Sequence, residues 1–147
     1  MKTTTSIVLL CILTMFAVAA NSLDDVRRLD KAGASRTGDN ASLLHVAARF
    51  AEPPMLAYLT SVGFGIEDPG DASGPALIVA VTSHRLDNAG WLIDHGANVN
   101  ATDRSGGPVL RHALVCKDQE VVDFLVKSGA VPDAKTIEVA RKLGLRL

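Results

Sequence analysis

The chain has 147 residues, of which 48% are hydrophobic and 21% are charged, and its formal net charge is −1. This length fits one globular domain. Because acidic and basic residues nearly balance, the chain lacks the polybasic surface of a protein that binds nucleic acid or an anionic membrane.

The first twenty residues have the pattern of an export signal. Lys2 precedes an almost unbroken apolar run of 14 residues, Ile7–Ala20, which ends in small residues that suit a signal peptidase. This run is short for a membrane span of about 20 residues. We therefore expect removal of residues 1–20, with an uncleaved anchor as the alternative, and a periplasmic or secreted protein. The remaining domain, 21–147, has 14 basic and 16 acidic residues (net −2) and a single cysteine, Cys116, so no intrachain disulfide can form.

The central part of the chain repeats itself every 33 residues. Four columns of identical residues keep this interval without slippage: Leu44, Leu77 and Leu110; Ala47, Ala80 and Ala113; Leu59, Leu92 and Leu125; Gly63, Gly96 and Gly129. Such a period indicates stacked helical units, each of which buries its apolar face against its neighbours. The alanine column predicts close helix packing, because a larger side chain would push adjacent units apart.

Each unit predicts two short antiparallel helices that end at the recurring glycine. In the third unit, Pro108 can open a helix that runs to about Cys116. Asp118 can cap a second helix, which ends at Gly129. The other helices are predicted at 42–51, 53–61, 75–83 and 86–95. The full repeats are expected at about 39–66, 72–99 and 105–131.

Incomplete units are predicted at both ends of the array. Residues 23–29 read as the second helix of a first repeat, and 136–143 read as the first helix of a last one. Both segments are rich in charged residues. This suits capping units, because the ends of a stacked-repeat array must be polar on the outside.

The motif residues resemble the ankyrin repeat. Ser42-Leu43-Leu44-His45-Val46-Ala47-Ala48 is similar to the family's Thr-Pro-Leu-His-x-Ala-Ala opening, and the segment from Trp91 to Ala101 is similar to its second helix and hairpin. The resemblance implies an all-α solenoid of stacked helix-turn-helix units with half-repeat caps. Ile78 and Arg111 replace the family's histidine. We therefore expect a less stable array with the same fold.

No catalytic constellation is recognisable, so we expect a protein that is not an enzyme and has no cofactor. His45 stands at the family's structural histidine position, and His84 is expected to be solvated. His112 and Cys116, at i and i+4, share a helix face, but a closed zinc site needs four ligands. A metal- or thiol-dependent protein that uses this pair is the alternative from another functional class.

The resemblance also implies a partner-binding surface, since ankyrin repeats usually meet partners with hairpin tips and the exposed side of the first helices. Carried over by register, the candidates are Asp39, Arg49, Phe50, Asp71, Thr82, Ser83, Thr102, Arg104, Ser105 and Cys116. Phe50 is the most informative, because an exposed aromatic beside Arg49 is typical of a binding hot spot. The alternative is that Phe50 covers the first hairpin or packs on Pro53 and Pro54.

These observations favour a non-catalytic, exported protein-binding module. By analogy with small exported ankyrin-like proteins, we expect an immunity or inhibitor protein that neutralises a toxic enzyme. An accessory partner of a periplasmic enzyme, such as an oxidative-stress enzyme, is the alternative. We expect one specific protein partner, no nucleic acid, no membrane after signal cleavage, and a monomer when unbound.

Overall fold

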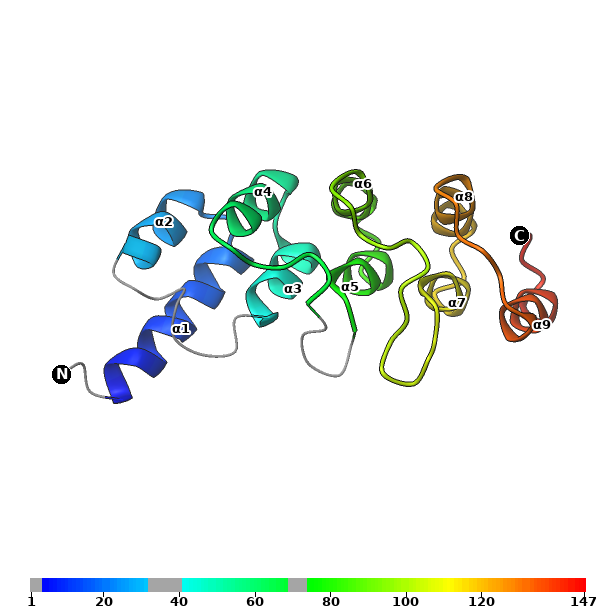
Figure 1. The fold of residues 1–147 in the computed structure, drawn as a ribbon, viewed down its shortest axis with the longest axis horizontal. Coiled ribbons are helices and arrows are strands. Elements are labelled where there is room, and N and C mark those ends of the chain that lie inside the picture. Colours follow the sequence, from blue (N-terminus) through cyan, green and yellow to red (C-terminus); the bar gives the residue numbers. More distant parts are fainter. Residues whose placement is uncertain (1–3, 32–40, 69–73) are drawn as a thin grey trace.

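The computed structural model of the chain describes residues 4–31, 41–68 and 74–147. Within these residues the chain forms helices and no strand, and the helices lie in two layers (Figure 1). One layer holds the first helices: α1 (Thr4–Ala19), α3 (Ala41–Phe50), α5 (Ala76–Thr82), α7 (Val109–Val115) and α9 (Ala134–Leu143). The other layer holds the second helices: α2 (Leu23–Lys31), α4 (Pro53–Ser61), α6 (Leu86–Asp94) and α8 (Gln119–Lys127). The predicted all-α solenoid is confirmed.

The leucine and alanine columns of the repeat form the core. All nine leucine and alanine residues of these three columns are buried. Helix α3 packs on α5 and α5 packs on α7, and the alanines allow these helices to approach closely. The glycine column has another role, because its members adopt positive φ angles of 97° to 107° at the ends of the second helices. Glycine adopts this conformation without steric cost.

Polar contacts join the first two central repeats. The Nε2 of His45 lies 2.8 Å from the carbonyl oxygen of Gly74, in the link that precedes α5. This is the structural role that the ankyrin motif predicts for His45. From α6, the buried Nδ2 of Asn88 donates to the carbonyl oxygens of Ala48 and Ala51, at 3.0 and 2.9 Å. These bonds satisfy carbonyl groups near the end of α3, which has no later turn to pair them.

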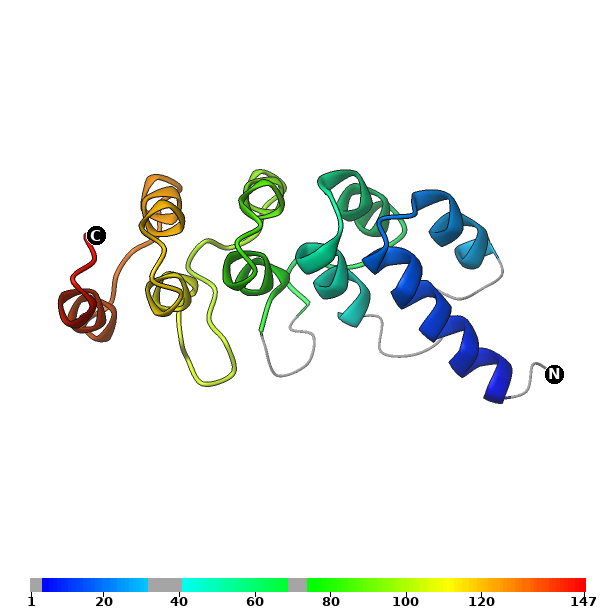
Figure 2. The same cartoon turned by 180° about the vertical axis from the view of Figure 1, so that it is seen from behind.

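At the N-terminal end, α1 packs against both α2 and α3, as the two opposite views show (Figures 1 and 2). The side chains of Thr14, Ala17 and Val18 are buried in this contact. In the full chain, α2 therefore has a partner helix and does not form a half-repeat by itself. Removal of residues 1–20 stays a prediction.

At the C-terminal end, α9 packs on α7. The carboxylate of Asp133 accepts a hydrogen bond from the backbone N–H of Thr136 at 2.7 Å, and this contact caps the helix N-terminus. Gly144 ends the helix with a φ of 69°. Thr136 and Ala140 are buried, and the helix has the sequence signals of a regular solenoid cap.

Candidate partner-binding surface

The C-terminal ends of the first helices form an exposed strip along one side of the solenoid. Arg49 and Phe50 lie at the end of α3, Thr82 at the end of α5 and Val115 at the end of α7, and all four are exposed. Phe50 is 54% exposed and Val115 is 66% exposed. The strip therefore has a large apolar side chain at each end and a polar residue between them. Exposed apolar residues with a cation nearby can supply binding energy to a protein interface.

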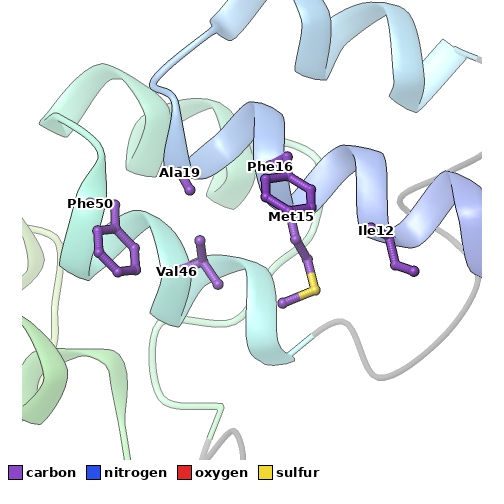
Figure 3. Close-up of a pocket in the computed structure, with 6 residues that line it drawn as sticks. All are labelled: Ile12, Met15, Phe16, Ala19, Val46 and Phe50. Atoms are coloured by element: carbon purple, nitrogen blue, oxygen red, sulfur yellow. The ribbon is translucent and has the colours of Figure 1, made fainter.

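Phe50 is exposed, as the repeat register predicts. The guanidinium carbon of Arg49 lies 5.2 Å from the centre of its ring, within the range of a cation–π contact. Phe50 and Val46 also line one side of an apolar groove of about 330 Å³, and α1 lines the other (Figure 3). Phe50 thus lies where α3 meets α1, and its role as a hot spot stays a prediction.

The middle of the strip offers less free hydrogen-bonding capacity than its sequence indicates. The hydroxyl of Thr82 donates within its own helix, towards the carbonyl oxygens of Ile78 and Val79. Ser83 and Cys116, at the positions equivalent to Phe50, are half-buried. We infer that contact area, more than hydrogen bonding, is what this part of the strip can provide.

The link that precedes α7 is held together by one carboxylate. The Oδ1 of Asp103 accepts from the backbone N–H and the hydroxyl of Ser105 and from the N–H of Gly107, at 2.6 to 2.8 Å. Its Oδ2 accepts from the Nε2 of His112 at 2.8 Å. These bonds, led by those from Ser105 and Gly107, lower the pKa of Asp103 well below its ordinary value.

The same link presents three of the candidate residues. Thr102, Arg104 and Ser105 are exposed, and the link projects beyond α7 on the side away from α8 (Figure 1). A Cβ at Gly107 would lie 2.5 Å from the guanidinium of Arg111 and 2.6 Å from a carboxylate oxygen of Asp103, so a side chain there would displace one or both of these groups. The sequence placed Arg104 and Ser105 on a hairpin tip but missed Asp103, which holds that tip in shape.

His84, like His112, has a carboxylate partner that the repeat pattern does not predict. His84, expected to be solvated, is half exposed, and its Nδ1 lies 2.8 Å from the Oδ2 of Asp118. Asp118 also caps α8, as predicted, because its Oδ1 accepts from the N–H groups of Glu120 and Val121. The contact with His84 is the main reason that the pKa of Asp118 is lowered.

The pair His112 and Cys116 was the one candidate for metal or thiol chemistry. The Nε2 of His112 is bound to Asp103. Burial, with a smaller effect from the negative charge of Asp118, raises the pKa of the Cys116 thiol above its ordinary value of 9.0. The protonated thiol therefore predominates at neutral pH and is a weak nucleophile. Among the described residues, no group of three or more His, Cys, Asp or Glu side chains could hold a metal ion.

Asp39 and Asp71 complete the set of candidates from the sequence. Both lie outside the described residues, which resume at 41 and at 74. The surface that can be described therefore consists of the strip on α3, α5 and α7 and of the link before α7.

A comparison with family models supports the repeat pattern. A model described as ankyrin repeats, in three copies, matches residues 14–103. The match covers more than half of the chain, and it begins within α1 and ends in the link before α7. A comparison with curated proteins finds no match.

Proposed function

The chain belongs to the ankyrin-repeat family, whose members are generally non-catalytic protein-interaction modules, and we propose that it is an exported module that binds one specific protein partner and neutralises a toxic enzyme. The observation that supports a partner-binding role is the exposed strip, which places Phe50 and Val115 in solvent at its two ends. Aromatic side chains that are accessible on a folded surface are common anchors of protein interfaces, and Val115 adds apolar contact area beside them.

The charged residues on this side of the solenoid are suited to recognising the partner, and they do not supply most of the binding free energy. Arg49 lies beside Phe50, and Arg104 is exposed on the link before α7. Both are cationic, so a partner with an acidic patch next to an apolar one would fit this surface. An enzyme that is blocked in this way would have its active site covered by the strip or by the projecting link.

The proposed location is the periplasm or the exterior of the cell. The apolar N-terminal segment with Lys2 before it supports export. An inhibitor in that compartment would meet a toxic enzyme where it arrives, before it acts on the cell. An accessory role beside a periplasmic enzyme uses the same surface and is the competing outcome of the experiment below.

Affinity capture from the source organism tests the proposal. The double variant Arg49→Ala, Phe50→Ala should lose a stoichiometric protein that the unchanged chain retains. Val126→Ala with Lys127→Ala is the matched control, because it also removes an apolar and a cationic side chain, both exposed, from the opposite layer. Equal capture by both double variants would contradict the assigned surface, and capture of no protein would contradict the binding role.

The enzymatic activity of the captured protein then distinguishes the inhibitor role from the accessory role. Titration of its enzymatic activity with the chain should give full inhibition at one equivalent, and co-expression of the chain should protect cells from it. An activity that rises or stays unchanged would contradict neutralisation and favour the accessory role.

A further inference from the structure

The residues that a signal peptidase would recognise are built into the fold of the first repeat. Such a peptidase requires small side chains one and three positions before the bond that it cuts. Cleavage after Ala19 would use Ala17 and Ala19, and cleavage after Ala20 would use Val18 and Ala20. Ala17 is 9% exposed and Val18 is fully buried, where α1 packs against α2 and α3 (Figure 2). Each possible cut therefore has one of its two recognition residues in the core.

The backbone around the two bonds is closed by hydrogen bonds. The N–H of Ala20 donates to the carbonyl oxygen of Phe16 at 2.8 Å. The N–H of Ser22 donates to the carbonyl oxygen of Ala17 at 2.9 Å. Proteolysis of a folded chain usually proceeds through local unfolding of the segment that is cut. In this chain, that local unfolding would have to break both hydrogen bonds and withdraw Ala17 or Val18 from the core.

The turn that follows α1 is fixed to the next two helices. Asn21 has a positive φ of 55°, and its Oδ1 accepts a hydrogen bond from the backbone N–H of Glu52, at the start of α4, at 3.1 Å. The hydroxyl of Ser22 donates to the carboxylate of Asp25 in α2 at 2.6 Å. Contacts with α2, α3 and α4 thus hold the segment on both sides of the two bonds, and opening it requires that α1 leaves the solenoid.

We propose that the docking of α1 in the first repeat protects both cleavage sites, so that a chain which folds before export keeps residues 1–20. Cleavage is a hydrolysis in which water adds across the peptide bond and leaves a carboxylate on Ala19 or Ala20 and an amine on the next residue. The bond is accessible in an unfolded chain and is protected in the folded repeat, so folding and processing compete for the same residues. The inference rests on the export signal of the proposed function, and it does not involve the partner-binding surface.

Digestion of the full chain with a signal peptidase in mild detergent tests the proposal. A synthetic peptide of residues 8–28, which contains both bonds without the rest of the fold, is the reference substrate. The folded chain should be cleaved more slowly than this peptide by roughly tenfold or more, because the cleavage rate follows the small population of open molecules. Intact mass identifies the bond that is cut, and amide exchange in the same detergent should show that α1 is protected.

Substitutions of Val26, the buried residue of α2, release α1 without changing residues 1–20. Val26→Asp should raise the cleavage rate of the full chain by roughly tenfold, because a carboxylate without a partner would be buried beside α1. Val26→Ala disturbs the repeat less and should raise the rate by a smaller factor. Val131→Asp is the matched control, since it makes the same change at a valine that is 69% exposed, and it should be cleaved like the unchanged chain.

The outcomes distinguish failure of this inference from failure of the proposed export. Equal cleavage rates of the peptide and the unchanged chain, or rapid amide exchange throughout α1, would show that docking gives no protection. Rates that stay unchanged in both Val26 variants would show that cleavage does not require release of α1. Either result overturns the inference and leaves the export signal in place. A peptide that is cut at neither bond would overturn the inference by contradicting the export signal itself.

Discussion

The two ends of the solenoid are built differently. Helix α9 exposes Lys135, Glu138, Arg141 and Lys142, and it has an aspartate cap at its start and a glycine at its end. Helix α1 has no charged residue, and the side chains that it exposes between residues 12 and 19 are apolar. The C-terminal end therefore satisfies the requirement that a repeat array present a polar surface to water. The N-terminal end does not, because the apolar residues of α1 have the composition of an export signal.

The strongest test of this comparison places a charge at the buried side of each end helix. Val18→Asp and Ala140→Asp should each destabilise their end repeat by roughly 3–5 kcal/mol, because a carboxylate would be buried without a partner. Since repeats contact only their neighbours, amide hydrogen exchange should show loss of protection in α1 and α2 for the first variant and in α9 for the second. Protection in α5 and α6 should persist in both. An unchanged α2 in Val18→Asp would show that α1 does not support it.

Acid should loosen the C-terminal half before the N-terminal end. Among the residues that the structure describes, the three carboxylates with a lowered pKa, Asp103, Asp118 and Asp133, all lie beyond α6. A carboxyl whose pKa is lower in the folded state than in the unfolded state stabilises the fold above its unfolded value of about 4, and this contribution is lost as the pH falls through the folded value. We expect exchange protection in α7 to α9 to decrease faster than in α3 and α5 as the pH falls below about 4, and Asp103→Asn to reduce that pH dependence. Uniform loss along the chain would contradict this prediction.

The smallest effect concerns the contact of α2 with α4. The hydroxyl of Tyr58 donates to the Oδ2 of Asp30 at 2.9 Å, so Tyr58→Phe should lower the free energy of unfolding by about 1 kcal/mol. Glu138→Gln at the other end removes an exposed pair with Lys142 and should cost less, about 0.3–0.5 kcal/mol. Chemical denaturation measures both variants. An equal effect would show that the link between α2 and α4 contributes no more than a surface ion pair.

The repeat period was sufficient to predict the helix pairs from α3 to α8, because the same four columns recur in each unit. It was not sufficient for α1, whose apolar run has the composition of an export signal. A clue was nevertheless present in the sequence. Ala17 and Val18 lie 30 residues before Ala47 and Ala48, so the alanine position of the repeat continues into α1 once the link between the two repeats is shortened by three residues.

The candidate surface could be predicted in part. The register correctly identified Phe50 and Arg104 as exposed residues, because exposure follows from position in the repeat. The partners of His84 and His112 could not be derived in the same way. Each contact joins a histidine to a carboxylate whose place depends on a turn, and the repeat columns carry no information about turn geometry. Asp103 could have been found from its spacing to Ser105 and Gly107, which favours an aspartate-centred turn.

The buried amide of Asn88 limits how far the repeats can be exchanged with one another. The equivalent positions, 33 residues away on either side, are Met55 in α4 and Val121 in α8. Neither side chain could donate to the carbonyl groups at the end of α3, which Asn88 satisfies. An engineer who duplicated, deleted or reordered units of this array would therefore have to keep α6 next to α3. The repeats share one pattern, but the contact of Asn88 with the end of α3 fixes the order of these two repeats.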